Sequence, residues 1–163
     1  MAPGRPSKSA RPPKSLEARA IGLLARREYA RAELRDRLLA TGADRTEVDA
    51  VLDRLEKLGY LCDARFATGV VHRKAGRYSK RAIAYALKEK GVAPTAAKDA
   101  LVALDGVDDL AQAQALWQQR FGHPPKDDKE KARHVRFLLA RGYSPAIAYR
   151  VLRAAGTSVD DDA

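Results

Sequence analysis

The sequence has a single cysteine, Cys62, among its 163 residues, and only 6 % of the chain is aromatic. One cysteine excludes an internal disulfide and a paired-cysteine metal site, and it fits a reducing cytoplasm. No apolar run approaches the roughly 20 residues that a membrane-spanning helix needs. We therefore expect a cytoplasmic protein without a membrane contact.

Motifs of catalysis and cofactor binding are also missing. The chain has no Gly-rich phosphate loop and no HExxH motif, and His72, His123 and His134 are not at metal-ligand spacing. We expect no enzyme, no metal and no cofactor. We expect Cys62 to be half-buried at a helix start, Asp63 to cap that helix, and His134 to lie on the surface of a basic helix.

Helix-forming residues dominate what is present. Charged residues make up 32 % of the chain, and Ala, Leu, Arg, Lys and Glu are abundant. Apolar residues recur at a spacing near 3.6 in segments of 11 to 14 residues that end at glycines. This composition and pattern predict an all-α protein. Trp117, the only tryptophan, is expected to anchor a core.

An internal repeat runs through the helical pattern. Tyr29, Tyr78 and Tyr143 each stand 13 residues before a glycine, which is Gly42, Gly91 or Gly156. The offsets are 49 and 65 residues, which predicts about 16 additional residues in the third copy, near Phe121-Gly122-His123-Pro124-Pro125. We infer three tandem three-helix repeats in an elongated or curved row. The expected organisation is a disordered basic arm at 1–14, repeats at 15–60, 61–105 and 106–156, the last with a longer first hairpin, and an acidic tail at 157–163.

Positive charge is concentrated in two blocks. The net charge is +10, and residues 61–92 carry 8 Lys/Arg against 2 Asp/Glu. Residues 131–156 carry 6 Lys/Arg and no acid, whereas residues 15–60 balance at 9 against 9. Such patches predict an oriented contact with a polyanion. The basic arm at 1–14 is either a solvated tail or an aid to nucleic-acid binding.

The basic blocks supply the candidate binding residues. A helix over 79–90 would place Arg81, Tyr85 and Lys88 on the face opposite Ile83 and Leu87. A basic face with interleaved tyrosine can follow a phosphate backbone and stack on exposed bases. The predicted nucleic-acid-binding residues are Arg73, Lys74, Arg77, Lys80, Arg81, Tyr85, Lys88, Arg133, Arg136, Arg141, Arg150 and Arg153.

Several segments resemble one known family. The sequence is similar to the RecX regulatory proteins at three segments and at Arg73 and Gly76. The segments are Tyr-Leu-Cys-Asp-Ala-Arg-Phe-Ala at 60–67, Lys-Gly-Val at 90–92 and Arg-His-Val-Arg-Phe-Leu-Leu-Ala-Arg-Gly-Tyr-Ser at 133–144. The resemblance covers about residues 16–155. It implies a modulator that binds in the groove of the RecA recombinase filament, bridges neighbouring protomers and restrains ATP hydrolysis, strand exchange and co-protease activity. Together with the charge pattern, it leads us to expect that the basic residues meet the filament or single- and double-stranded DNA.

Two other functions stay open at this point. One is a stand-alone DNA- or RNA-binding protein of helix-turn-helix type, and the other is a helical scaffold without nucleic acid, which the two basic blocks disfavour. A protein-directed modulator should use the neutral first repeat as a partner surface. The residues predicted for that surface are Arg31, Glu33, Arg35 and Asp36, and the protein is expected to be a monomer.

Overall fold

The computed structural model describes residues 11–157, so most of the predicted arm and nearly all of the acidic tail lie outside the described residues. Within this range the chain has nine α-helices, one short 3₁₀ helix and no strand. The all-α prediction is confirmed. The helices are α1 (Leu16–Leu24), α2 (Arg31–Leu39), α3 (Arg45–Lys57), α4 (Asp63–Lys74), α5 (Lys80–Glu89), α6 (Pro94–Leu101), α7 (Asp109–Arg120), α8 (Asp128–Ala140) and α9 (Pro145–Thr157), with η1 (Val102–Leu104) after α6.

Side-chain caps fix where several helices begin. The Ser15 hydroxyl accepts a hydrogen bond from the Ala18 N–H, and the Asp44 carboxylate accepts from Thr46 and Glu47. These bonds satisfy N–H groups that the first turn of a helix leaves without partners. Asp108 and Asp127 cap α7 and α8 in the same way, Ser79 caps α5, and Ser144 caps α9, where proline follows as predicted.

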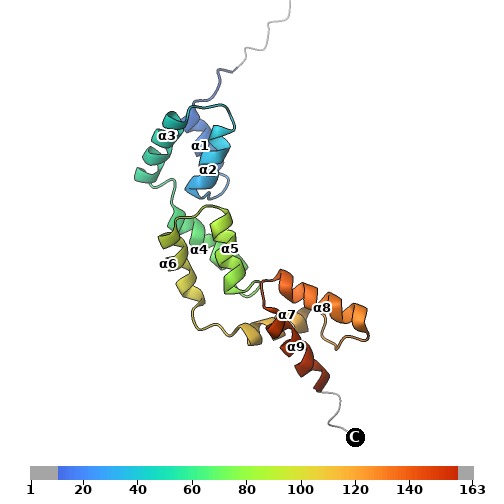
Figure 1. The fold of residues 1–163 in the computed structure, drawn as a ribbon. Coiled ribbons are helices and arrows are strands. Elements are labelled where there is room, and N and C mark those ends of the chain that lie inside the picture. The colour runs from blue at the N-terminus through green and yellow to red at the C-terminus, as the bar shows by residue number, and fades with distance from the viewer. Residues whose placement is uncertain (1–10, 158–163) are drawn as a thin grey trace, which may run out of the picture.

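Three small hydrophobic cores follow one another along the chain. Each is formed mainly by three consecutive helices, so the protein consists of three three-helix units; the second core also includes Ala30, which precedes α2. Figure 1 shows them as an elongated row that bends between the second and third units. Unit 1 comprises α1–α3, unit 2 comprises α4–α6, and unit 3 comprises α7–α9. The largest fully buried side chains include Leu34, Leu38, Leu52 and Leu55 in unit 1, Ile83 and Leu87 in unit 2, and Leu138 and Val151 in unit 3.

The predicted register of the third unit is wrong. Gly42, Gly91 and Gly142 follow the second helix of their units and have φ values of 85°, 68° and 92°. Gly91 and Gly142 are 51 residues apart, so the second and third units match at an offset of 51 and not 65. Tyr143 precedes the third helix of its unit, whereas Tyr29 precedes a second helix. The Arg-Gly-Tyr-Ser turn resembled the turns before α2 and α5 in sequence but joins a different pair of helices.

Asp63 joins units 1 and 2. The prediction that it caps α4 is wrong. It is the first residue of α4, and the preceding Cys62, half-buried as expected, makes no side-chain capping bond. The Asp63 carboxylate accepts from the Arg31 N–H at 2.8 Å and from the Ala93 N–H at 2.9 Å. One carboxylate thus binds the starts of α2 and α6, where helix dipoles favour negative charge.

Units 2 and 3 meet through a backbone contact. The Ser79 N–H donates to the carbonyl of Arg141 at 2.9 Å, and the Ser79 hydroxyl donates to the carbonyl of Gly142 at 2.8 Å. The Gln112 amide also donates to the carbonyl of Tyr78 at 3.1 Å. The start of α5 is therefore held against the end of α8.

His134 is buried, in contrast to its predicted surface position. Its exposed fraction is 0 %, and its Nδ1 accepts from Trp117 Nε1 at 3.2 Å. The ring of Phe121 stacks on the His134 ring at 3.8 Å between centroids. Trp117 is 6 % exposed in the core of unit 3, as predicted. The exposed arginines on either side of it in sequence, Arg133 and Arg136, are the reason that a surface position was expected.

Candidate nucleic-acid interface

A groove of about 490 Å³ lies at the junction of units 2 and 3. Its walls come from the end of α4 and the turn that follows it, from α5, and from the end of α8 and the turn that follows it. Because Arg81 and Tyr85 are four residues apart on α5, both side chains face the same side of that helix. The groove is lined by Lys74, Tyr78, Arg81, Ala82, Tyr85, Leu139, Ala140, Gly142 and Tyr143.

Cations and tyrosines alternate in this groove, and no carboxylate lines it. Lys74 Nζ lies 4.3 Å from the centroid of the Tyr78 ring, and the Arg141 guanidinium lies 4.9 Å from the same centroid. Arg141 also donates to the carbonyl of Arg77 at 3.3 Å. These contacts orient cations beside a half-buried aromatic ring, an arrangement that suits phosphate groups and nucleobases.

The two remaining tyrosines of the groove differ in environment. Tyr85 is 64 % exposed, so its ring is free for stacking. A hydrogen bond to the Glu89 carboxylate raises the pKa of Tyr85. Tyr143 is 3 % exposed and belongs to the core of unit 3, and burial raises its pKa to about 12. Both phenols are therefore neutral at pH 7 and add no negative charge to the groove.

The twelve predicted binding residues do not form one surface. Lys74, Arg81 and Tyr85 line the groove, and Arg141 contacts Tyr78 at its edge. Arg73 and Arg77 are exposed on the adjoining end of α4 and its turn. The others are elsewhere: Lys80 and Lys88 line an apolar hollow between α5 and α6, Arg133 and Arg136 line a hollow with Asp127 and Glu130, Arg153 lines one with Tyr149, and Arg150 is exposed on α9.

Lys80 and Arg81 are neighbours in sequence but differ in their ion pairing. Lys80 forms an ion pair with Asp105. Arg81 forms no ion pair among the described residues. Neutralisation by Asp105 reduces the attraction of Lys80 for an external anion, so Arg81 is the stronger phosphate ligand of the two.

Most of the residues predicted for a protein partner hold unit 1 together. Arg31 pairs with Asp53 at 2.8 Å and with Glu56 at 3.1 Å, and Arg35 pairs with Asp49 at 3.0 Å. Glu33 binds Arg27 at 2.7 Å and Lys90 of unit 2 at 3.2 Å. Burial opposes ionisation of Glu33, but the hydrogen bonds from Arg27 and Lys90 outweigh it and lower its pKa. Asp36 alone of the four is exposed and without an ion pair in residues 11–157.

Sequence reasoning missed Tyr78, Leu139 and Tyr143 as groove residues. Tyr78 and Tyr143 were visible as members of the repeated tyrosine column, which was a signal of structural importance. Leu139 had no signal, because an apolar residue on an amphipathic helix is expected in the core, yet it is 39 % exposed beside the groove. The site is created by the packing of α5 against the end of α8, and this tertiary contact could not be predicted from the sequence.

The described residues also limit what other sites the protein has. No cluster of three or more His, Cys, Asp or Glu side chains in this part of the chain could hold a metal ion. None of the helices described here is both long enough and apolar enough to pass through a bilayer.

Family models match all three units of the chain. The models for the first, second and third three-helix domains of RecX match residues 18–55, 63–101 and 107–152. The chain is also 44 % identical to the regulatory protein RecX of Leptothrix cholodnii, over 94 % of this chain and 98 % of that protein. Its identity to the regulatory protein RecX of Ralstonia nicotianae is 42 %, over 93 % of this chain and 94 % of the relative.

Solved structures show the same fold. The crystal structure of RecX from Lactobacillus salivarius matches with a TM-score of 0.63 at 19 % identity, over 87 % of this chain and 95 % of that chain. A second crystal structure of a regulatory protein RecX matches with a TM-score of 0.60 at 16 % identity, over 85 % and 72 % of the two chains. The matched domains, the identities over nearly the whole chain and the shared three-unit fold together show that this chain belongs to the RecX family.

Proposed function

We propose that this protein binds the nucleoprotein filament of the RecA recombinase and modulates, mainly by inhibition, its ATPase, strand-exchange and co-protease activities. The observation that carries the proposal is the basic, tyrosine-lined groove between α5 and α8 in a chain of the RecX family. The relatives that match it are named regulatory proteins.

The groove supplies the contact with DNA. Arg81 and Lys74 attract phosphates, and the exposed ring of Tyr85 is available to stack on a base. The site lies where two units meet, so binding there depends on how the row is bent. An elongated row of three units also has the length to contact more than one protomer of a helical filament, which a single three-helix unit lacks.

DNA-dependent ATP hydrolysis by the cognate RecA tests the proposal, with this protein titrated in at fixed DNA. Inhibition at far less than one protein per RecA molecule supports a filament-directed modulator. Inhibition that needs enough protein to coat the DNA, and that extra DNA relieves, contradicts it. In that case the protein is a stand-alone DNA-binding protein that competes for the lattice.

A groove variant connects this activity to the site. Arg81→Gln combined with Lys74→Gln is expected to weaken inhibition of ATP hydrolysis roughly tenfold, since each lost phosphate contact removes attraction to the polyanion. Lys57→Gln combined with Lys98→Gln is the matched control. It removes the same charge from two exposed lysines that lie outside the groove, and it should inhibit like the wild type.

A further inference from the structure

Charges in unit 1 balance in the sequence but separate in the structure. Six of its nine acidic residues form ion pairs, namely Glu17, Glu28, Glu33, Asp49, Asp53 and Glu56. Arg19, Arg26 and Arg37 form no ion pair among the described residues. A unit with no net charge therefore has a set of cations without counterions.

These three arginines surround one hollow of about 320 Å³ between α1 and α2, and Lys14 also lines it. Arg19 is on α1 and Arg26 is in the turn that follows it, and both side chains are exposed. No acidic residue is among the lining residues. The hollow thus presents four positive charges to solvent.

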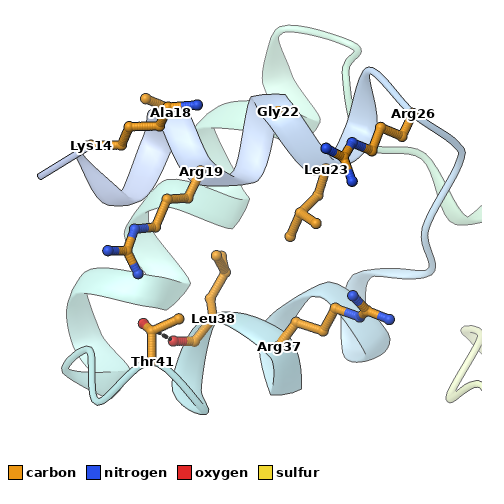
Figure 2. Close-up of a pocket in the computed structure, with 9 residues that line it drawn as sticks. All are labelled: Lys14, Ala18, Arg19, Gly22, Leu23, Arg26, Arg37, Leu38 and Thr41. Atoms are coloured by element: carbon orange, nitrogen blue, oxygen red, sulfur yellow. Dashed lines mark hydrogen bonds between the residues drawn. The ribbon is translucent and has the colours of Figure 1, made fainter. Parts of the chain in front are cut away.

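The hollow has two cationic ends and an apolar floor. Figure 2 shows Leu23 of α1 and Leu38 of α2 pointing toward each other across it. Arg19 lies toward one end, and Arg26 and Arg37 lie toward the other. Gly22 on the wall faces open space, because nothing lies within 4 Å of the position its Cβ would take.

This alternation matches the chemistry of a nucleic-acid strand, in which phosphates are separated by a sugar and its base. We propose that the hollow is a second nucleic-acid contact, which binds phosphates of one strand at its two cationic ends and an intervening sugar or base against the half-buried Leu23. A small inorganic anion would use one cationic end only and would leave Leu23 uncovered.

The position of the hollow relative to the first groove fits one continuous ligand. In Figure 1, α3 and α6 lie on the left of the row, whereas α2, α5 and α8 lie on its right. Helix α2, which lines the hollow, and helices α5 and α8, which line the groove, therefore lie along the same side of the row in this view. The inference extends the nucleic-acid contact of the proposed function to unit 1, and its test needs no recombinase.

The experiment compares two variants of the full chain with equal net charge. Arg19→Gln with Arg37→Gln removes one cation from each end of the hollow. Arg45→Gln with Lys57→Gln removes two exposed cations at the ends of α3 in the same unit. Neither forms an ion pair with the part of the chain that the structure describes, and neither lines the hollow. Binding to a labelled oligothymidylate is measured by fluorescence anisotropy over a range of salt concentrations, and circular dichroism checks that both variants are folded.

The hollow variant should bind roughly tenfold more weakly at 0.1 M salt, and the slope of log K against log salt should fall by about 1.4, or 0.7 for each phosphate contact on a single strand. The control should change affinity by less than about threefold, because charge outside a contact acts only through screened long-range attraction.

Equal losses in the two variants would overturn the proposal, because net charge alone would then explain binding. An unchanged affinity of the hollow variant would overturn it as well, while leaving the RecA inhibition by the groove untouched. A further measurement follows the amide resonance of Gly22. Inorganic phosphate at the same phosphate concentration and ionic strength should shift it far less than the oligonucleotide does, and an equal shift would mean a small-anion site and no strand contact.

Discussion

Gly142, at the end of α8, lies directly against Ala82 of α5, and a Cβ at Gly142 would be 2.4 Å from the Cβ of Ala82. Gly91 has the same relationship to Ala32 of α2, with a separation of 2.6 Å. At each junction, the glycine after the second helix of one unit therefore packs against the second helix of the preceding unit. Both junctions of the row are built on the same contact.

Gly142→Ala should destabilise the junction of units 2 and 3 beyond the cost of its backbone conformation. Gly106→Ala is the matched control, because Gly106 also has a positive φ, 79°, but nothing within 4 Å of its Cβ position. The control should lose roughly 1 kcal/mol, the cost of a side chain at positive φ. Gly142→Ala should lose about 1–3 kcal/mol more, because Ala82 cannot move aside. Urea unfolding measures both, and equal losses would show that the close contact is unimportant.

Asp63→Asn should weaken the connection between units 1 and 2. The amide can accept from only one of the Arg31 and Ala93 N–H groups and presents its own donors to the other, so we expect a loss of roughly 2 kcal/mol in the free energy of unfolding. Asp109→Asn, at the first residue of α7, is the control for the interaction of a carboxylate with a helix start. A loss no greater than that of the control would show that the two bonds contribute nothing.

Protonation of His134 should destabilise unit 3 in mild acid. Burial lowers its pKa, and the nearby His123 and Arg133 lower it further, while Glu130 opposes them. The unfolded chain, with an ordinary histidine pKa of about 6.5, then binds the proton more readily than the folded protein. Stability is therefore unaffected above about pH 6.5 and falls as the pH drops below it, by at most about 1.4 kcal/mol per pH unit for this proton.

His134→Gln tests this expectation, because glutamine does not titrate and can still accept from Trp117. The free energy of unfolding of this variant should depend less on pH between 7 and 5.5 than that of the wild type. His72→Gln changes an exposed histidine on α4 and should keep the dependence of the wild type. The same pH dependence of the free energy of unfolding in all three proteins would contradict a role of His134 in the loss of stability in acid.

Tyr85→Ala should weaken binding to single-stranded DNA by about 1–3 kcal/mol, the usual contribution of stacking one base on an aromatic ring. Tyr85→Phe keeps the ring and should bind nearly as well as the wild type. Tyr60→Ala removes a similarly exposed ring, 53 % against 64 %, outside the groove. Anisotropy titrations compare the three variants. An equal loss of affinity in Tyr60→Ala would contradict a specific stacking role of Tyr85 in the groove.

Local structure in this protein was predictable because it depends on residues close together in the chain. Helical periodicity, the glycine-containing turn between α4 and α5, and the Ser144-Pro145 start of α9 all appear where the sequence indicated. The exposure of Arg81 and Tyr85 opposite Ile83 and Leu87 also follows from helical spacing alone. The placement of the third unit was not predictable in this way, because the turns before Tyr78 and Tyr143 look alike but connect different helices.

The sequence by itself determined an all-helical chain of three units, the two basic blocks and the absence of familiar catalytic motifs, since these depend on composition and spacing. Tertiary structure alone decided how the charged residues are used. Asp63 bridges two units. Lys80 has an ion pair, whereas Arg81, Arg19 and Arg37 have none within residues 11–157. Ion pairing depends on distances between side chains that lie far apart in sequence, and a charge count does not contain those distances.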